Sequence, residues 1–217
     1  MKSAQNGSRL VLASASPRRR ELLLELGVSF EISVSGVDED GDFRGRKPAD
    51  VAMELALLKA RDVGSKVNDG LILGADTVID YGGELLGKPE SPRHAFEMLA
   101  RLSGKDHLVI TGVSLFEPSS GTSWTRFEAT RVRMRAASGP EIEAYVESGE
   151  PMDKAGSYAI QGLGESLVDS IEGCYNNVVG LPLCLVWELL GQSGFKALAA
   201  SPCRLPSGQP CPHSAAP

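Results

Sequence analysis

The sequence contains little that would build a disulfide framework or a zinc site. Its four cysteines, Cys174, Cys184, Cys203 and Cys211, form no Cys-x-x-Cys pair, and its three histidines do not lie at zinc-ligand spacing from them. The apolar run near Met1 is too short for a signal peptide, and nowhere do about 18 consecutive apolar residues predict a membrane span. We therefore expect a cytoplasmic protein of a reducing compartment, with no membrane partner.

Fingerprints of common nucleotide-binding sites and hydrolases are also missing. Near "RLSGKD", Leu99 stands where a GxxxxGK phosphate loop needs its first glycine, and "GLGESL" lacks the last glycine of GxGxxG. There is no GxSxG elbow and no HExxH, and three scattered histidines argue against a Ser-His-Asp triad. Chemistry based on a carboxylate and water remains open.

Acidic residues outnumber basic ones, and a change in composition near the C-terminus marks the end of the domain. There are 22 lysines and arginines against 28 acidic residues, a net charge of −6, so we expect no nucleic-acid partner. Hydrophobic residues make up 42% of the 217 residues, enough for the core of one domain, which we place at 9–191. Residues 196–217, rich in Pro, Ser, Gly and Ala, predict a disordered tail.

Strand-like and helix-like segments alternate along the domain. Alternating or β-branched runs predict strands at 9–13, 29–35, 71–75, 107–117 and 125–135. Helical periodicity and capping residues predict helices at 17–26, 49–63, 92–102, 140–148 and 182–190. The glycines of "YGGE" (81–84) predict a turn between two short strands. The fold class is therefore α/β with a mixed sheet.

The stretch "LASASPRRRELLLELG" places three arginines, 18–20, in the first turn of a helix. A cation is disfavoured there by roughly 0.3 to 1 kcal/mol, because that end carries the positive pole of the helix dipole. The hydroxyls of Ser14 and Ser16, the helix N–H groups and the arginines would together form an anion cradle. The alternative is a solvated basic patch paired with Glu21 or Glu25.

Two further segments carry candidate chemistry. In "LILGADTVID" an apolar strand is expected to end at Gly74 and to deliver Asp76 and Thr77 to the carboxyl edge of the sheet. A carboxylate there can accept a proton from water or hold a divalent metal, whereas the alternative is an aspartate that caps a turn. Twelve residues later "GKPE" adds Lys88, which is otherwise an ordinary turn lysine.

The segment "GEPMDKAGSYAIQGLG" (149–164) predicts an ordered loop, because apolar residues interrupt its glycines and polar groups. Gln161 has donors and an acceptor that suit the edge of a base. The alternative is a turn-rich surface segment in which Glu150, Asp153 and Lys154 pair among themselves. "NNVVGLP" (176–182) is expected to be mainly structural.

Six motifs together resemble the Maf family of nucleotide pyrophosphatases. They are "LASASPRR", "GADT", "GKP", "RLSG", "EPMDKAGSYAIQG" and "NNVVGLP", in the family's order, over Leu10 to about Leu190. The resemblance implies a Maf/ITPase-like fold: a mixed twisted sheet flanked by helices, with two lobes around a central cleft. It also implies hydrolysis of a nucleoside triphosphate between its α and β phosphates with a divalent metal, Mg²⁺ or Mn²⁺.

The resemblance assigns roles to particular residues. Asp76, the aspartate of "GADT", is expected to be the proton acceptor and one metal ligand, with the other ligands unassigned. Because a triphosphate at the anion cradle would neutralise the arginines, we further hypothesise that Ser14, Arg18, Lys59 and Lys88 contact phosphates. Lys59 lies in "LALLKAR", where a surface lysine is the alternative and the resemblance favours the contact.

The chain is similar to the branch of the family that acts on dTTP and UTP. It matches this branch at Arg19, Thr77 and Gln161, the positions linked with base specificity. Two departures are small: Arg20 has no family role, and Ala159 stands where glycine is frequent.

Two other functions are compatible with these motifs. One keeps the chemistry but acts on modified pyrimidine nucleotides, as an enzyme that cleans the nucleotide pool. The other is a nucleotide-binding regulator of cell division that acts without turnover. Asp76, Lys88 and Gln161 together favour the enzyme, because a sensor needs no water-activating carboxylate. The resemblance is also compatible with a homodimer.

Overall fold

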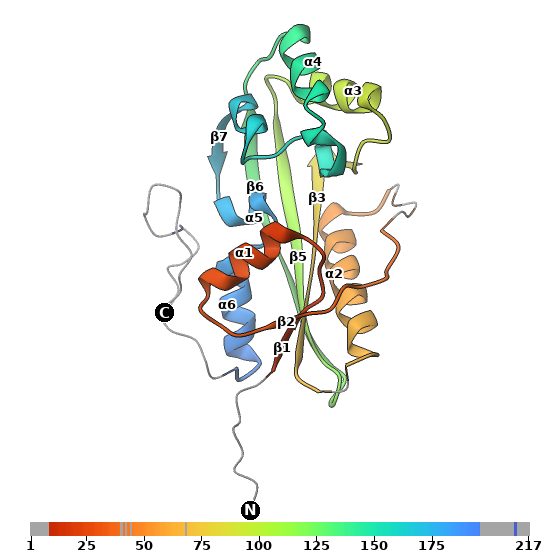
Figure 1. Ribbon diagram of the computed structural model, residues 1–217, viewed down its shortest axis with the longest axis vertical. Helices are drawn as coiled ribbons and strands as arrows, with labels where there is room; N and C mark the ends of the chain where they lie inside the picture. Colours follow the sequence, from red (N-terminus) through yellow and green to blue (C-terminus); the bar gives the residue numbers. More distant parts are fainter. Residues whose placement is uncertain are drawn as a thin grey trace, which may run out of the picture.

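A computed structural model describes residues 9–195 except positions 40, 42, 44 and 68, together with Cys211. A long sheet runs through the molecule, with helices on both of its faces and at one end (Figure 1). Among the described helices, none combines the length and apolar character needed to cross a bilayer. The predicted tail at 196–217 lies outside the described residues apart from Cys211.

The sheet has seven strands in the order β2-β1-β3-β5-β6-β7, with β4 paired to β3. Strand β1 is parallel to β2 and β3, whereas the remaining pairs are antiparallel. The predicted mixed α/β sheet is therefore confirmed. The strands are β1 Leu10–Leu12, β2 Glu31–Ile32, β3 Leu71–Tyr81, β4 Glu84–Leu86, β5 Asp106–Glu117, β6 Thr122–Met134 and β7 Val168–Glu172.

Capping residues set the helix boundaries near the predicted positions. Ser16 and Ser91 each accept a backbone N–H at the start of a helix, and Ser138 with Glu141 forms the predicted capping box. The helices are α1 Pro17–Glu25, α2 Pro48–Gly64, α3 Pro92–Leu102, α4 Gly139–Glu147, α5 Tyr175–Val179 and α6 Leu183–Gln192. Short 3₁₀ turns η1 Glu150–Asp153, η2 Ala155–Ser157 and η3 Leu163–Leu167 make the predicted loop ordered.

The prediction that a strand ends at Gly74 is wrong, because β3 continues to Tyr81. Glycine is needed at position 74 for a different reason: a Cβ there would lie 2.1 Å from the Ala56 carbonyl oxygen of α2. Asp76 is therefore in the middle of a strand and not at its carboxyl edge. The strand predicted at 29–35 is also much shorter, Glu31–Ile32, since among the described strands its one partner is the three-residue β1.

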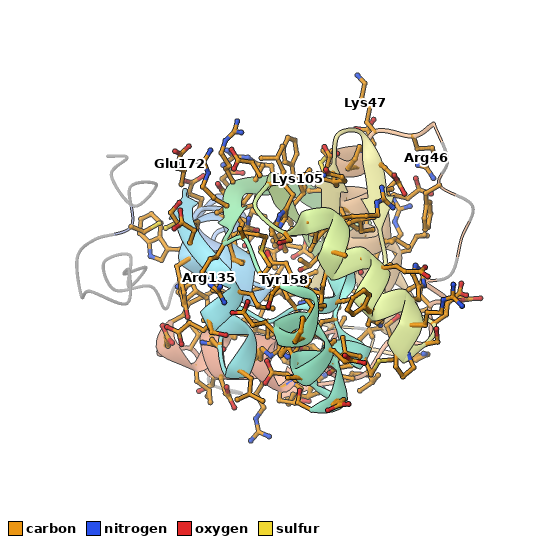
Figure 2. All side chains as sticks on the ribbon, turned by 90° about the horizontal axis from the view of Figure 1, so that it is seen from above. Arg46, Lys47, Lys105, Arg135, Tyr158 and Glu172 are labelled. Atoms are coloured by element: carbon orange, nitrogen blue, oxygen red, sulfur yellow. The ribbon has the colours of Figure 1, made fainter. Side chains whose placement is uncertain are left out.

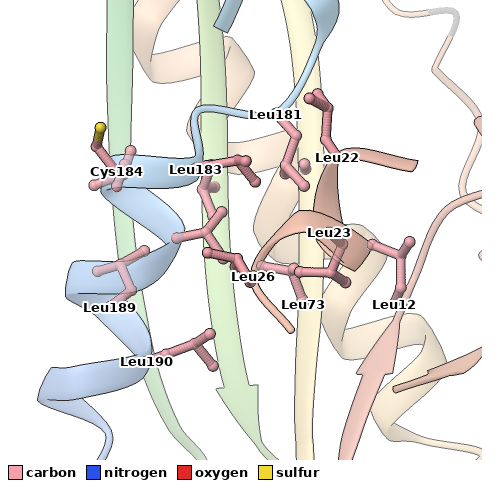
Figure 3. Packing of buried hydrophobic residues seen from close by; sticks show 14 of the residues in the cluster. Leu12, Leu22, Leu23, Leu26, Leu73, Leu181, Leu183, Cys184, Leu189 and Leu190 are labelled. Atoms are coloured by element: carbon pink, nitrogen blue, oxygen red, sulfur yellow. The ribbon is translucent and has the colours of Figure 1, made fainter. Parts of the chain in front are cut away.

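Two apolar clusters lie on one face of the long strands and form two lobes. The larger packs α1 and α6 on the sheet through leucines such as Leu23 and Leu189, as Figure 3 shows. The second packs α3 and α4 on the sheet through Leu99 and Ile142. Along β3, Ala75 belongs to the first cluster and Ile79 to the second. Thr77, which lies between them on the same face, belongs to neither cluster.

His107, at the start of β5, is 3% exposed and makes stability depend on pH. Burial lowers its pKa from 6.5 to about 4, against a smaller opposing effect of Asp106. Between these values the unfolded chain binds a proton that the folded chain does not, so stability falls as the pH drops through this window. We expect a loss of about 2 kcal/mol by pH 5.

Chemical denaturation of the wild-type protein and a His107→Leu variant at pH 7 and pH 5 measures this loss. The carboxylates are common to both proteins, so the difference between the two pH dependences isolates the histidine. Parallel pH dependences would contradict the prediction.

Candidate active site

A break in strand pairing opens the cleft. On its outer edge β3 pairs with β1 up to Leu73 and with β4 from Ile79, and among the described strands none pairs with that edge in between. The inner edge is paired continuously with β5 from Ile72 to Asp80. A cavity of about 440 Å³ lies beside the unpaired interval. It receives side chains from both faces of the sheet, because successive residues of a strand point to opposite faces.

Asp76 takes part in a chain of four alternating charges. Lys59 Nζ on α2 lies 2.6 Å from Asp76 Oδ1 and 2.6 Å from Glu39 Oε1, and the Lys59 and Asp76 side chains are only 6% and 8% exposed. Lys88 Nζ lies 3.0 Å from Glu39 Oε2. Burial alone would raise the pKa of Glu39, but the hydrogen bonds and charges of Lys59 and Lys88 lower it to about 2. The predicted Asp76, Lys59 and Lys88 are thus brought together, and Glu39 is an addition that sequence reasoning missed.

Thr77 faces the other side of the sheet, where Arg19 binds it. Arg19 Nη2 donates to Thr77 Oγ1 at 3.0 Å, Nε donates to the Gly180 carbonyl at 2.9 Å, and Nη1 donates to Ser14 Oγ at 3.4 Å. Burial lowers the pKa of Arg19, while the charges of Asp76 and Glu39 oppose the shift. The guanidinium therefore ties β3, the β1–α1 loop and the segment "NNVVGLP" together. The segment was expected to be mainly structural, but Val178, Val179 and Gly180 also line the cavity.

The start of α1 faces the cavity. Ser14, Ser16, Arg18 and Arg19 line it, so these two arginines point inward as the anion-cradle interpretation requires. Arg20 is exposed. Helix N–H groups and two cations therefore converge on one space, an arrangement that binds anions.

The loop at 149–164 supplies the far wall. Lys154 lines the cavity, and its Nζ donates to the Glu150 carbonyl at 2.7 Å and to Asp153 Oδ1 at 2.5 Å. The local pairing of these residues is thus present within an ordered loop. The structure does not bring Gln161 into the lining: its side chain is exposed and hydrogen-bonds with Tyr175, although the preceding Ile160 does line the cavity. Its role in base recognition stays a prediction.

Comparison with known proteins identifies the family. A family model described as "Maf-like protein" matches residues 9–193. The chain belongs to the Maf family. The site of this Maf protein therefore occupies the part of the chain that the family model covers.

Curated relatives match nearly their whole length. A "dTTP/UTP pyrophosphatase" of Moorella thermoacetica is 52% identical over 187 residues, which is 86% of this chain and 96% of the relative. One of Gloeobacter violaceus is 50% identical over 185 residues, 85% of this chain and 95% of the relative. One of Deinococcus radiodurans is 45% identical over 194 residues, 89% of this chain and 97% of the relative. The similarity thus extends over the cleft and both lobes of this Maf protein.

Proposed function

We propose that this Maf protein is a pyrophosphatase that hydrolyses dTTP and UTP to the monophosphate and pyrophosphate and so helps to clean the nucleotide pool. The names of its relatives support this activity. The observation that carries it is a buried carboxylate, Asp76, held by Lys59 at a cavity that the cationic start of α1 also lines. A carboxylate beside converging cations suits the attack of water on a polyanion.

The triphosphate would lie between the start of α1 and the two lysines. Ser14, Arg18, Lys59 and Lys88 are the proposed phosphate contacts, and all four line the cavity. A phosphate at the helix N-terminus accepts hydrogen bonds from the backbone N–H groups. It also neutralises the arginines, whose positive charge is unfavourable at this end of the helix in the free protein. Substrate binding therefore removes the repulsion that made the arginine run unusual.

Asp76 is the proposed general base. Lys59 donates to Oδ1 and fixes the orientation of the carboxylate, so that Oδ2 can accept a proton from a water molecule in the cavity. The cations around the cavity would then stabilise the negative charge that develops on the phosphates.

We infer that Asp76 and Glu39 would hold the Mg²⁺ or Mn²⁺. Among the described residues, no group of three or more His, Cys, Asp or Glu side chains is placed to bind a metal ion. Mg²⁺ is commonly held by one or two carboxylates together with substrate phosphates, so Asp76 and Glu39 would suffice. Both oxygens of Glu39 pair with lysines in this structure, and Glu39 would exchange one of these lysines for the ion. When bound, the ion would neutralise phosphate charge.

Arg19, Thr77 and Gln161 are the proposed determinants of base specificity. The carbonyls and N3–H of thymine and uracil match a guanidinium donor and an amide, whereas cytosine reverses part of this pattern and leaves polar groups unpaired. Arg19 and Thr77 are already bonded to each other in the cavity. Gln161 does not line the cavity and would contact the base from next to it.

Pyrophosphate release from a panel of canonical and modified nucleoside triphosphates, with Mg²⁺ or Mn²⁺, tests this function. We expect release from dTTP and UTP and little from dCTP or purine nucleotides. Preferred turnover of a modified pyrimidine would change the substrate and keep the chemistry. Binding of nucleotides without turnover would overturn the proposal in favour of a regulator.

A further inference from the structure

The cavity has two chemically different parts. Its edge carries the cations and carboxylates, but its floor on the sheet face of Thr77 is apolar. Ile79 and Val109 are paired across β3 and β5 and follow Thr77 on the same face. Tyr158 and Val178 join these two residues in the cavity lining.

Tyr158 is held in this lining by a buried hydrogen bond. Its hydroxyl lies 2.6 Å from His107 Nε2, and the two rings meet edge to face with centroids 5.4 Å apart. Tyr158 is 6% exposed. Figure 2 shows it among the elements in the interior of the view, whereas Arg46, Lys47 and Glu172 lie at the periphery.

A buried histidine at position 107 is energetically unfavourable compared with an apolar residue. Among the described residues, none forms a hydrogen bond with its buried Nδ1. A leucine would fill similar space and carry no polar atom of its own that needs a partner. What the histidine adds over an apolar residue is therefore its one hydrogen bond, with Tyr158.

Two consecutive residues with positive φ precede Tyr158 in the chain. Gly156 and Ser157 have φ of 68° and 63°, and Ser157 is the one non-glycine with positive φ among the described residues. For Ser157 this conformation costs of order 1 to 3 kcal/mol and persists only where surrounding contacts hold it, whereas glycine adopts it readily. Gly156 N–H donates to the Gly87 carbonyl at 3.0 Å, which links this bend to the residue before Lys88.

We propose that Ile79, Val109, Tyr158 and Val178 form the pocket for the nucleoside part of the nucleotide, and that His107 is a positioning residue that holds Tyr158 as its wall. This inference rests on the proposed function. A sugar and a planar base present apolar faces that suit such a surface and an aromatic ring, whereas phosphates would lose hydration there without a partner. The floor continues from Thr77 and Arg19, so a nucleoside on it keeps the base near those two residues.

The two reaction products, dTMP and pyrophosphate, allow the two parts of the cavity to be tested separately, because the enzyme hydrolyses neither of them. dTMP carries the nucleoside and pyrophosphate does not, so their dissociation constants are measured by calorimetry with Mg²⁺ present. Tyr158→Phe and His107→Leu should each weaken dTMP binding and raise the KM for dTTP about five- to tenfold, with kcat and pyrophosphate binding within twofold. His107→Gln, which keeps a hydrogen-bonding group, should stay within about threefold of wild type.

Tyr145→Phe is the matched control. Tyr145 contacts the same loop, since its hydroxyl donates to Glu150 Oε1 and accepts from Ala159 N–H, but it does not line the cavity. This variant should leave dTMP binding within twofold. Equal weakening by Tyr145→Phe and Tyr158→Phe, equal weakening of pyrophosphate and dTMP, or no dTMP binding by the wild type would overturn the pocket. If dTMP binds as expected but no triphosphate is hydrolysed, the pocket stands and the proposed function fails.

Discussion

Asp76→Asn should lower kcat for dTTP roughly 100- to 10,000-fold, the range in which a positioned general base contributes. Asparagine keeps an oxygen that can accept from Lys59 Nζ, so the side chain stays in place while its ability to take a proton is lost. Glu39 remains as a carboxylate partner of the buried Lys59, so we expect the melting temperature to change little and dTMP to bind within a few-fold of wild type. Steady-state pyrophosphate release and calorimetry measure the two quantities.

Asp80→Asn is the matched control on the same strand. Asp80 accepts from the Gly83 N–H in the β3–β4 turn, and it does not line the cavity. Its activity should stay within twofold of wild type. If Asp76→Asn retains more than a tenth of wild-type kcat, Asp76 is not the general base.

The second large effect is expected from Gly112→Ala. Gly112 pairs with Asp76 across β3 and β5, and a Cβ there would lie 2.2 Å from the Ala52 carbonyl oxygen and 2.6 Å from Met53 N. Both atoms are backbone and cannot rotate away, so α2 must move off the sheet. We expect a loss of about 3 kcal/mol in the free energy of unfolding, by denaturant titration. Activity should fall as well, because α2 carries Lys59.

Gly191→Ala provides the contrast. Gly191 lies in the last turn of α6, and a Cβ there would meet nothing within 4 Å. Alanine in a helix should stabilise by about 0.5 to 1 kcal/mol. A Gly112→Ala protein as stable as wild type would show that α2 does not need its close approach to the sheet.

Local signals made much of this fold predictable. Serine caps, prolines at first turns and glycines after the last turns act within a few residues, so the starts of α1, α3 and α4 could be predicted. β7 and α5, five residues each, were missed because they are too short to show a period.

The site was only partly accessible to the same reasoning. Motifs singled out Asp76 and Lys88, but Gly74 was interpreted as a strand end because its tertiary contact with α2 leaves no trace in the local sequence. Glu39 stands in the acidic run "VDEDGD", where composition cannot distinguish it from its neighbours. Its contacts with Lys59 and Lys88 come from residues 20 and 49 positions away. Side-chain direction is equally invisible, so the sequence could not show that the Gln161 side chain is exposed and does not line the cavity.

Beside the cleft, strand β3 is paired along one edge and, among the described strands, unpaired along the other. Beside Asp76 the strand is bonded to β5 along its inner edge, while its outer edge faces the cavity. The carboxylate thus sits on a scaffold that need not rearrange when ligands enter or leave. Lys88 and Glu39, by contrast, belong to exposed connecting segments. The proposed base is therefore held in place by backbone pairing, whereas the charged rim of the site is held by side-chain ion pairs.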